Sequence, residues 1–180
     1  MQTKKTRNTA AMESLRTMSK TEECVVKELL RMGASYNRIE TYYVQDCIVA
    51  AVNSNIQDFR NISDYVNAIK TKVAEKYGIT KPNLWKNIER TIDRMLYKGD
   101  YDYILSMFKG DYDPDRQTVA ANPFILTVAE KVRADMAKEY RNANYFRNKI
   151  KESVENITDP TLLNGIYNIM ISLKGGANNG

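Results

Sequence analysis

Apolar residues recur at intervals of three and four along most of the chain, and this spacing predicts a series of amphipathic helices. The first helix follows Ser19, which forms a capping-box sequence with Glu22, and it ends at Gly33. A second helix is expected around residues 36–55. No segment alternates apolar and polar residues as a half-buried strand does, so the pattern favours an all-α fold.

Polar caps and glycine stops divide residues 61–136 into four further helices. Their expected starts and stops are Asn61 or Ser63 to Gly78, Thr80 to Gly99, Asp100 to Gly110, and Asn122-Pro123 through Met136. The third and fourth helices each carry one apolar stripe, composed of Val66, Ile69, Val73, Ala74 and Tyr77 and of Leu84, Ile88, Thr91, Ile92 and Met95. These stripes are expected to be buried.

The third helix, its turn and the fourth helix have the pattern of a helix-turn-helix. This motif needs a small residue where the helices touch, a turn residue that tolerates positive φ, and apolar anchors on the second helix. Ala74, Gly78, Leu84 and Ile88 occupy these positions in order. An ordinary helical hairpin with a glycine C-cap is the alternative that the same spacing allows.

Helical geometry indicates which side chains of the fourth helix would be free to contact DNA. Asn83, Lys86, Arg90 and Asp93 lie opposite the apolar stripe. Asn83 suits adenine, Lys86 suits guanine, and Arg90 suits a phosphate. Trp85 flanks the stripe, where it either covers the helix interface or packs on a sugar or a thymine methyl group.

Charge draws attention to the same segment. The chain has 27 Lys and Arg against 22 Asp and Glu, for a net charge of +5. Residues 60–98 contain nine basic and four acidic residues, and residues 1–20 contain five and one. A polyanion site is therefore expected within 60–98, with the basic N-terminal tail as a second contact. Solubilisation of helix surfaces is the other explanation for these charges.

The segment from Val26 to Gly110 resembles the C-terminal DNA-binding domain of the sporulation initiation response regulator family, stage zero protein A. The similar stretches include LLRMG (29–33), VAEKYGIT (73–80) and KGDYDYILSMF (98–108), and ANPFILTVAEKVRADM (121–136) is similar to that domain's last helix. The resemblance implies a compact bundle of about six helices. It also implies a helix-turn-helix that binds duplex DNA in the major groove and a role in bacterial transcription control.

The chain also departs from this family. Residues 1–25 leave no room for the family's receiver domain, so control by an aspartyl phosphate is not implied. Where the family's recognition helix characteristically has Arg, Glu, Arg and Arg, this chain has Asn83, Trp85, Lys86 and Glu89, so a different target sequence is expected. The residues expected to bind DNA are Thr80, Lys81, Asn83, Trp85, Lys86, Glu89, Arg90 and Arg94.

Residues 138–174 lie beyond the family domain and are expected to form a helical hairpin. One helix is predicted over 142–156 and another from Asp159-Pro160 to the glycines at 175–176, followed by a disordered tail. Their apolar positions are Tyr145, Phe146, Ile150, Val154, Leu162, Leu163, Ile166, Tyr167, Met170 and Leu173. Such a hairpin needs a cover, either the same subunit or a second copy in a homodimer formed through residues 142–174.

The composition restricts the chemistry. The chain has no His, which excludes Ser-His-Asp and Cys-His relays, a His base, and zinc sites with His ligands. Cys24 and Cys47 are too few for a four-sulfur metal site and are expected to be reduced and buried in a cytoplasmic protein. Neither an apolar signal segment nor a long apolar run is present. We expect no enzyme activity, catalytic residue, cofactor, metal, membrane association or small-molecule substrate.

The expected organisation is a basic flexible tail (1–20), a helical DNA-binding domain (21–137), a helical extension (138–174) and a disordered tail (175–180). Two functions are compatible with it. The first is sequence-specific duplex DNA binding as a transcriptional regulator. The alternative is a protein-interaction or dimerisation module with a vestigial helix-turn-helix. Glu89 and Asp93 favour the alternative, because they place negative charge near the expected path of the phosphates. We expect the first.

Overall fold

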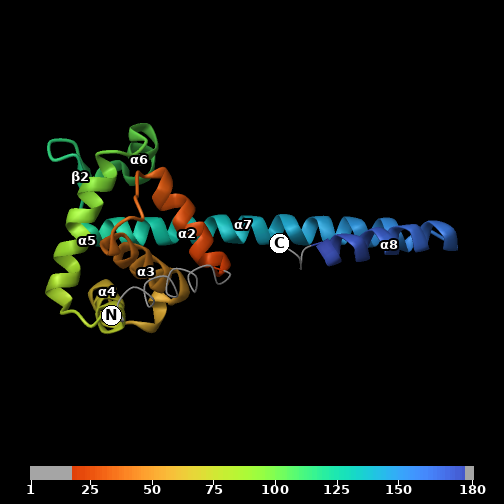
Figure 1. The fold of residues 1–180 in the computed structure, drawn as a ribbon, viewed down its shortest axis with the longest axis horizontal. Coiled ribbons are helices and arrows are strands. Elements are labelled where there is room, and N and C mark those ends of the chain that lie inside the picture. Colours follow the sequence, from red (N-terminus) through yellow and green to blue (C-terminus); the bar gives the residue numbers. More distant parts are fainter. Residues whose placement is uncertain (1–17, 177–180) are drawn as a thin grey trace, which may run out of the picture. The chain divides into compact units, whose positions relative to one another are not determined.

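A computed structural model describes residues 18–176, with the side chains of 173–176 left out (Figure 1). Its helices are α2 (Lys20–Arg31), α3 (Ile39–Asn53), α4 (Ile62–Tyr77), α5 (Lys81–Leu96), α6 (Tyr101–Phe108), α7 (Ala121–Glu155) and α8 (Pro160–Gly176). Two 3-10 turns, η1 (Ile56–Asp58) and η2 (Lys109–Asp111), and two strands, β1 (Tyr112–Asp113) and β2 (Thr118–Val119), complete the fold. The protein is all-α, and the expected tails at 1–20 and 175–180 fall largely outside the described residues.

The chain divides into two units within α7. One ends at Met136 and contains α2 to α6, the short hairpin and the first part of α7, while the other begins at Ala137 and contains the rest of α7 and all of α8. The helix-turn-helix pattern belongs entirely to the first unit.

Side-chain caps begin α2, α4, α5 and α6 where the sequence predicts them, whereas α7 begins at Ala121 and not at Asn122. The Ser19 hydroxyl accepts a hydrogen bond from the Glu22 backbone N–H at 3.3 Å, and the Glu22 carboxylate accepts one from the Ser19 N–H at 2.8 Å. This complete capping box holds the pKa of Glu22 below its usual value, chiefly through the hydrogen bonds with Ser19. The caps of α4, α5 and α6 are Asn61 (rather than Ser63), Thr80 and Asp100.

The predicted stripes of α4 and α5 lie in one hydrophobic core. Leu84, Ile88 and Ile92 of α5 are fully buried, whereas Tyr77 of α4 is only partly buried. Both cysteines are free thiols, but Cys24 is half-buried rather than buried. Cys47 is buried, and this burial raises the pKa of its thiol to about 12.

A short antiparallel hairpin corrects the expectation that no strand is present. Tyr112 pairs with Val119 and Asp113 with Thr118. The Asp113 carboxylate accepts hydrogen bonds from two N–H groups of its own loop, those of residues 115 and 116, at 3.0 and 3.1 Å. Strands of two residues are too short to show alternation, and a side-chain cap rather than periodicity specifies this turn.

The prediction of separate helices ending near Met136 and starting at Asn142 is wrong, because α7 runs without a break from Ala121 to Glu155. No Gly or Pro follows Pro123 within the helix, and the intervening residues 137–141 include Ala, Lys, Glu and Arg, which favour helix. The apolar spacing lapses there because that stretch is exposed.

Most apolar residues of the second unit are exposed, whereas Val154, Ile157 and Ile166 are half-buried. Those with more than half of their surface accessible are Tyr140, Tyr145, Phe146, Ile150, Leu162, Tyr167, Ile169, Met170 and Ile171. An exposed apolar surface of this extent is typical of an interaction site. Across residues 18–176, no helix has both the length and the apolar character that crossing a membrane requires.

Candidate nucleic-acid interface

Gly78 makes the turn between α4 and α5. Its backbone is left-handed, at φ 62° and ψ 32°. Its N–H donates to Glu75 O at 3.2 Å and the Ile79 N–H donates to Ala74 O at 3.1 Å, which together form a Schellman motif. A Cβ placed on Gly78 would meet no atom within 4 Å. The turn therefore requires glycine for its backbone angle and not for space.

α4 and α5 are held at this turn by buried contacts and by a polar link to α3. Ala74 is buried on α4, and α5 contacts α3, α4 and β2. Asp46 of α3 accepts hydrogen bonds from Lys76 Nζ at 2.6 Å and from the Tyr77 hydroxyl at 2.5 Å, at the end of α4. Burial, with this hydrogen bond, raises the pKa of the Tyr77 phenol.

α5 has the orientation that helical geometry predicts. Its apolar side is buried, while seven of the eight residues expected to bind DNA are exposed: Thr80, Lys81, Asn83, Lys86, Glu89, Arg90 and Arg94. These residues run the length of α5, and Asn83 and Lys86 lie in its first turns. We call these seven exposed residues together the α5 polar face.

Three of the residues expected to bind DNA already have local hydrogen bonds. The Thr80 hydroxyl accepts from the Asn83 backbone N–H at 3.4 Å and so serves as a helix cap. Lys81 Nζ donates to the Thr71 hydroxyl of α4 at 3.4 Å. Arg94 donates to the Arg90 carbonyl at 3.1 Å. Asn83, Lys86 and Arg90 keep their side chains turned to solvent.

Trp85 is half-buried against the core, with a cation on its ring. Lys70 Nζ of α4 lies 3.6 Å from the ring centroid, and burial lowers the pKa of Lys70 while the charge of Glu89 opposes that effect. This contact favours the helix-interface role for Trp85 over packing on DNA. Sequence reasoning missed Lys70, although its place one helical turn before Ala74 was a usable indication.

The two acidic residues of α5, Glu89 and Asp93, interact with neighbouring side chains of the first unit. The Thr118 hydroxyl of β2 donates a hydrogen bond to the Asp93 carboxylate, and Glu89 interacts electrostatically with Lys70. Within residues 18–176, neither Lys86 nor Arg90 has a carboxylate within 4 Å. The exposed cations of α5 therefore keep their charge available for an anionic partner.

No protein-family model, curated protein or solved structure matches the chain.

Proposed function

We propose that the protein binds duplex DNA through the α5 polar face and acts as a transcriptional regulator. One observation carries this proposal: α5 buries one side completely and presents Asn83, Lys86 and Arg90 on the other, without acidic partners for the two cations. A helix held in this way behind a glycine turn has the form of a recognition helix.

The side chains suit distinct contacts on DNA. Asn83 and Lys86, in the first turns of α5, are assigned to base edges, and Arg90 is assigned to a phosphate. The resemblance to the sporulation regulator's DNA-binding domain supports the same helix. In this proposal the protein works in the cytoplasm, without a cofactor and not as an enzyme.

Duplex DNA binding is tested by fluorescence anisotropy, first on random duplexes and then on sequences selected from them. We expect affinity to fall steeply between about 50 and 200 mM salt, because phosphate contacts release counterions. The variant Lys86→Ala/Arg90→Ala should bind much more weakly, since the base contact assigned to Lys86 is worth about 1–3 kcal/mol and the phosphate contact assigned to Arg90 adds to the loss.

The matched control is Lys138→Ala/Arg141→Ala, which removes two exposed positive charges from the second unit. It should retain sequence preference and most of the affinity. Weak binding that does not respond to salt, or an equal loss in both double variants, would contradict the assignment to α5.

A second candidate function, self-association, is favoured by the exposed apolar residues of the second unit. We propose that residues 142–174 pair with the same residues of a second copy. Phe146 of α7 is 62% exposed and Ile169 of α8 is 61% exposed. Residues 160–173 contain no charged side chain, so this face is suited to an apolar partner and not to DNA. A dimer would also present two recognition helices to two half-sites.

Solution mass of the full chain tests self-association, by sedimentation at several concentrations. We expect a dimer that Phe146→Lys/Ile169→Lys converts to a monomer. The control Leu30→Lys changes an apolar residue of the first unit that is 54% exposed, and it should remain dimeric. A wild-type chain that is monomeric at every concentration would exclude the dimer.

A further inference from the structure

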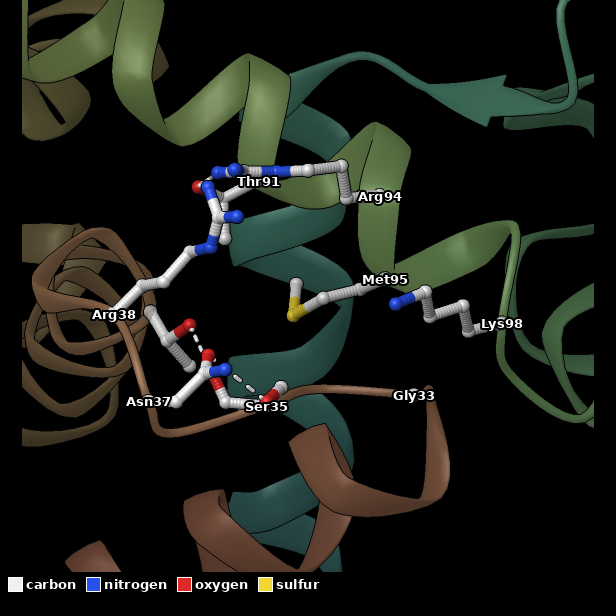
Figure 2. Close-up of a pocket in the computed structure, with 9 residues that line it drawn as sticks. Gly33, Ser35, Asn37, Arg38, Thr91, Arg94, Met95 and Lys98 are labelled. Atoms are coloured by element: carbon white, nitrogen blue, oxygen red, sulfur yellow. Dashed lines mark hydrogen bonds between the residues drawn. The ribbon is translucent and has the colours of Figure 1, made fainter.

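A second basic site lies away from the first turns of α5. The loop between α2 and α3 meets the carboxyl end of α5 and encloses a pocket of about 140 Å³ (Figure 2). Arg38 comes from the loop, and Arg94 and Lys98 come from the end of α5 and the residues after it. No acidic residue lines the pocket.

Two glycines, of which Gly33 lines the pocket, let the backbone segments beside it touch. Gly33 has φ +88°, and a Cβ there would lie 2.5 Å from Met95 O and 2.7 Å from Gly99 N. A Cβ on Gly99 would lie 2.5 Å from Met32 O. The backbone of the α2–α3 loop is therefore in direct contact with the backbone that ends α5, and side chains 60 residues apart in sequence are brought to one cavity.

The cations of the pocket converge without a counter-charge. Figure 2 shows the Arg38 and Arg94 side chains reaching toward one another beside Thr91. Arg94 is held there by its hydrogen bond to the Thr91 hydroxyl at 2.9 Å. Among residues 18–176, no carboxylate lies within 4 Å of either guanidinium or of Lys98 Nζ. Like charges gathered at a surface repel one another. An anion bound between them is attracted by each cation, and this attraction offsets the repulsion.

The amino end of α3 adds to the same field. Arg38 is the residue before α3, and its side chain makes no capping hydrogen bond. Thr41, in the first turn of α3, also lines the pocket. The first N–H groups of this 15-residue helix carry no side-chain cap, and the positive end of a helix favours anions, while Glu40 in the first turn offsets part of that field.

We propose that this pocket binds a phosphate group. Arginine forks match the oxygens of phosphate, and three cations suit its charge, which is about −1.5 to −2 for a monoester or inorganic phosphate near pH 7. Its volume is well below the roughly 300 Å³ at which sites for drug-sized ligands begin, so it accommodates the group and little more. The same group reaches a protein as free phosphate or within the backbone of DNA. The proposal does not depend on DNA binding by α5.

Thermal unfolding with inorganic phosphate tests the pocket without DNA. Phosphate should raise the unfolding midpoint of the wild-type chain by several degrees relative to chloride at equal ionic strength, because a ligand stabilises the folded state that binds it. Arg38→Met and Lys98→Met should each lose most of this shift. The control Arg60→Met, which removes an exposed cation outside the pocket, should keep it.

DNA affinity of the same variants identifies the source of the phosphate. If the pocket takes a backbone phosphate, Arg38→Met weakens DNA binding and reduces its salt slope by about 1, and inorganic phosphate competes with DNA. If it takes free phosphate, Arg38→Met binds DNA like the wild type and loses only the thermal shift. The proposal is overturned if phosphate shifts all four proteins equally or none of them, and Arg38→Met and Lys98→Met bind DNA like the wild type.

Discussion

The helices of the two units are alike in sequence pattern, yet their apolar residues have opposite surroundings. In the unit that ends at Met136, Ile88 and its neighbours on α5 are fully buried among α3, α4 and β2. In the unit that begins at Ala137, Phe146 and Ile169 are more than 60% exposed. An amphipathic pattern therefore predicts that a face will be covered, but it does not identify the cover.

Truncation of an apolar side chain should give the largest difference in unfolding free energy between the two units. Ile88→Ala removes a fully buried side chain and should lower the free energy of unfolding by about 2–5 kcal/mol, through lost burial and a cavity. Ile169→Ala makes the same chemical change on a residue that is exposed in the single chain, and at concentrations where the chain is monomeric it should stay within about 0.5 kcal/mol. Denaturation followed by circular dichroism, which reports the helices of both units, measures both changes, and fluorescence of Trp85, the only tryptophan, reports the first unit separately. Similar losses would show that Ile169 is covered as well.

Loss of the Arg133 side chain is expected to have the next largest effect on the free energy of unfolding. Arg133 of α7 donates to the carbonyl of Ala51, to that of Val52 at 3.2 Å and to that of Ser54 at 2.9 Å, and so caps the end of α3. Arg133→Met should lower the unfolding free energy by about 1.5–3 kcal/mol. Arg141→Met, in the exposed part of the same helix, is the control and should change it little. Equal midpoints in urea would refute the capping role.

Glycine substitution should have opposite signs in the two units. Gly78→Ala places a side chain at φ +62° and should cost about 1–2 kcal/mol, although space for the methyl group exists. Gly165 lies inside α8 without a positive φ, and Gly165→Ala should favour helix by about 0.5–1 kcal/mol. Circular dichroism during thermal unfolding reports both changes. A stabilised Gly78→Ala would mean that the turn tolerates another backbone conformation.

Helix caps should give the smallest difference. Ser19→Ala removes the capping box of α2 and should cost about 1 kcal/mol at pH 7. The folded protein lowers the pKa of Glu22. The Glu22 carboxylate therefore contributes to the free energy of unfolding above its unfolded-state pKa, and this contribution is lost as the pH falls through its folded-state pKa. The cost of Ser19→Ala should therefore shrink toward pH 3.

Asp159 offers the matched cap in the second unit, where its carboxylate accepts from the Thr161 N–H at 2.8 Å. Asp159→Ala should reduce helicity without moving the Trp85 unfolding transition, which reports on the first unit. A shifted Trp85 transition would indicate that the two units unfold together.

Local features of the fold were predictable where short-range chemistry decides them. Ser19 with Glu22, the Thr80 cap and the Gly78 stop each act within a few residues, and each is observed where the sequence indicates it. The same local reasoning failed for α7 between Met136 and Asn142, because it treated a loss of apolar spacing as a helix end. Exposure removes apolar spacing without breaking a helix.

The candidate sites differ in how far the sequence leads to them. Lys86 and Arg90 are four residues apart on one helix, so helical geometry alone places them on the same face. The contact of Lys70 with Trp85 joins α4 and α5. It could be predicted only from the angle at which these two helices pack. Arg38 was not singled out as a site residue at all, because nothing local marks it.

The sequence by itself determined the all-α class, the caps and stops of most helices, and the side of α5 that faces solvent, because these depend on neighbours within about one or two helical turns. Only the tertiary structure decided which apolar faces are buried and which cations converge. Arg38 and Arg94 share a pocket because Gly33 and Gly99 let two distant backbone segments touch. Such a contact depends on the packing of the whole unit, and the spacing of residues along the chain does not predict that packing.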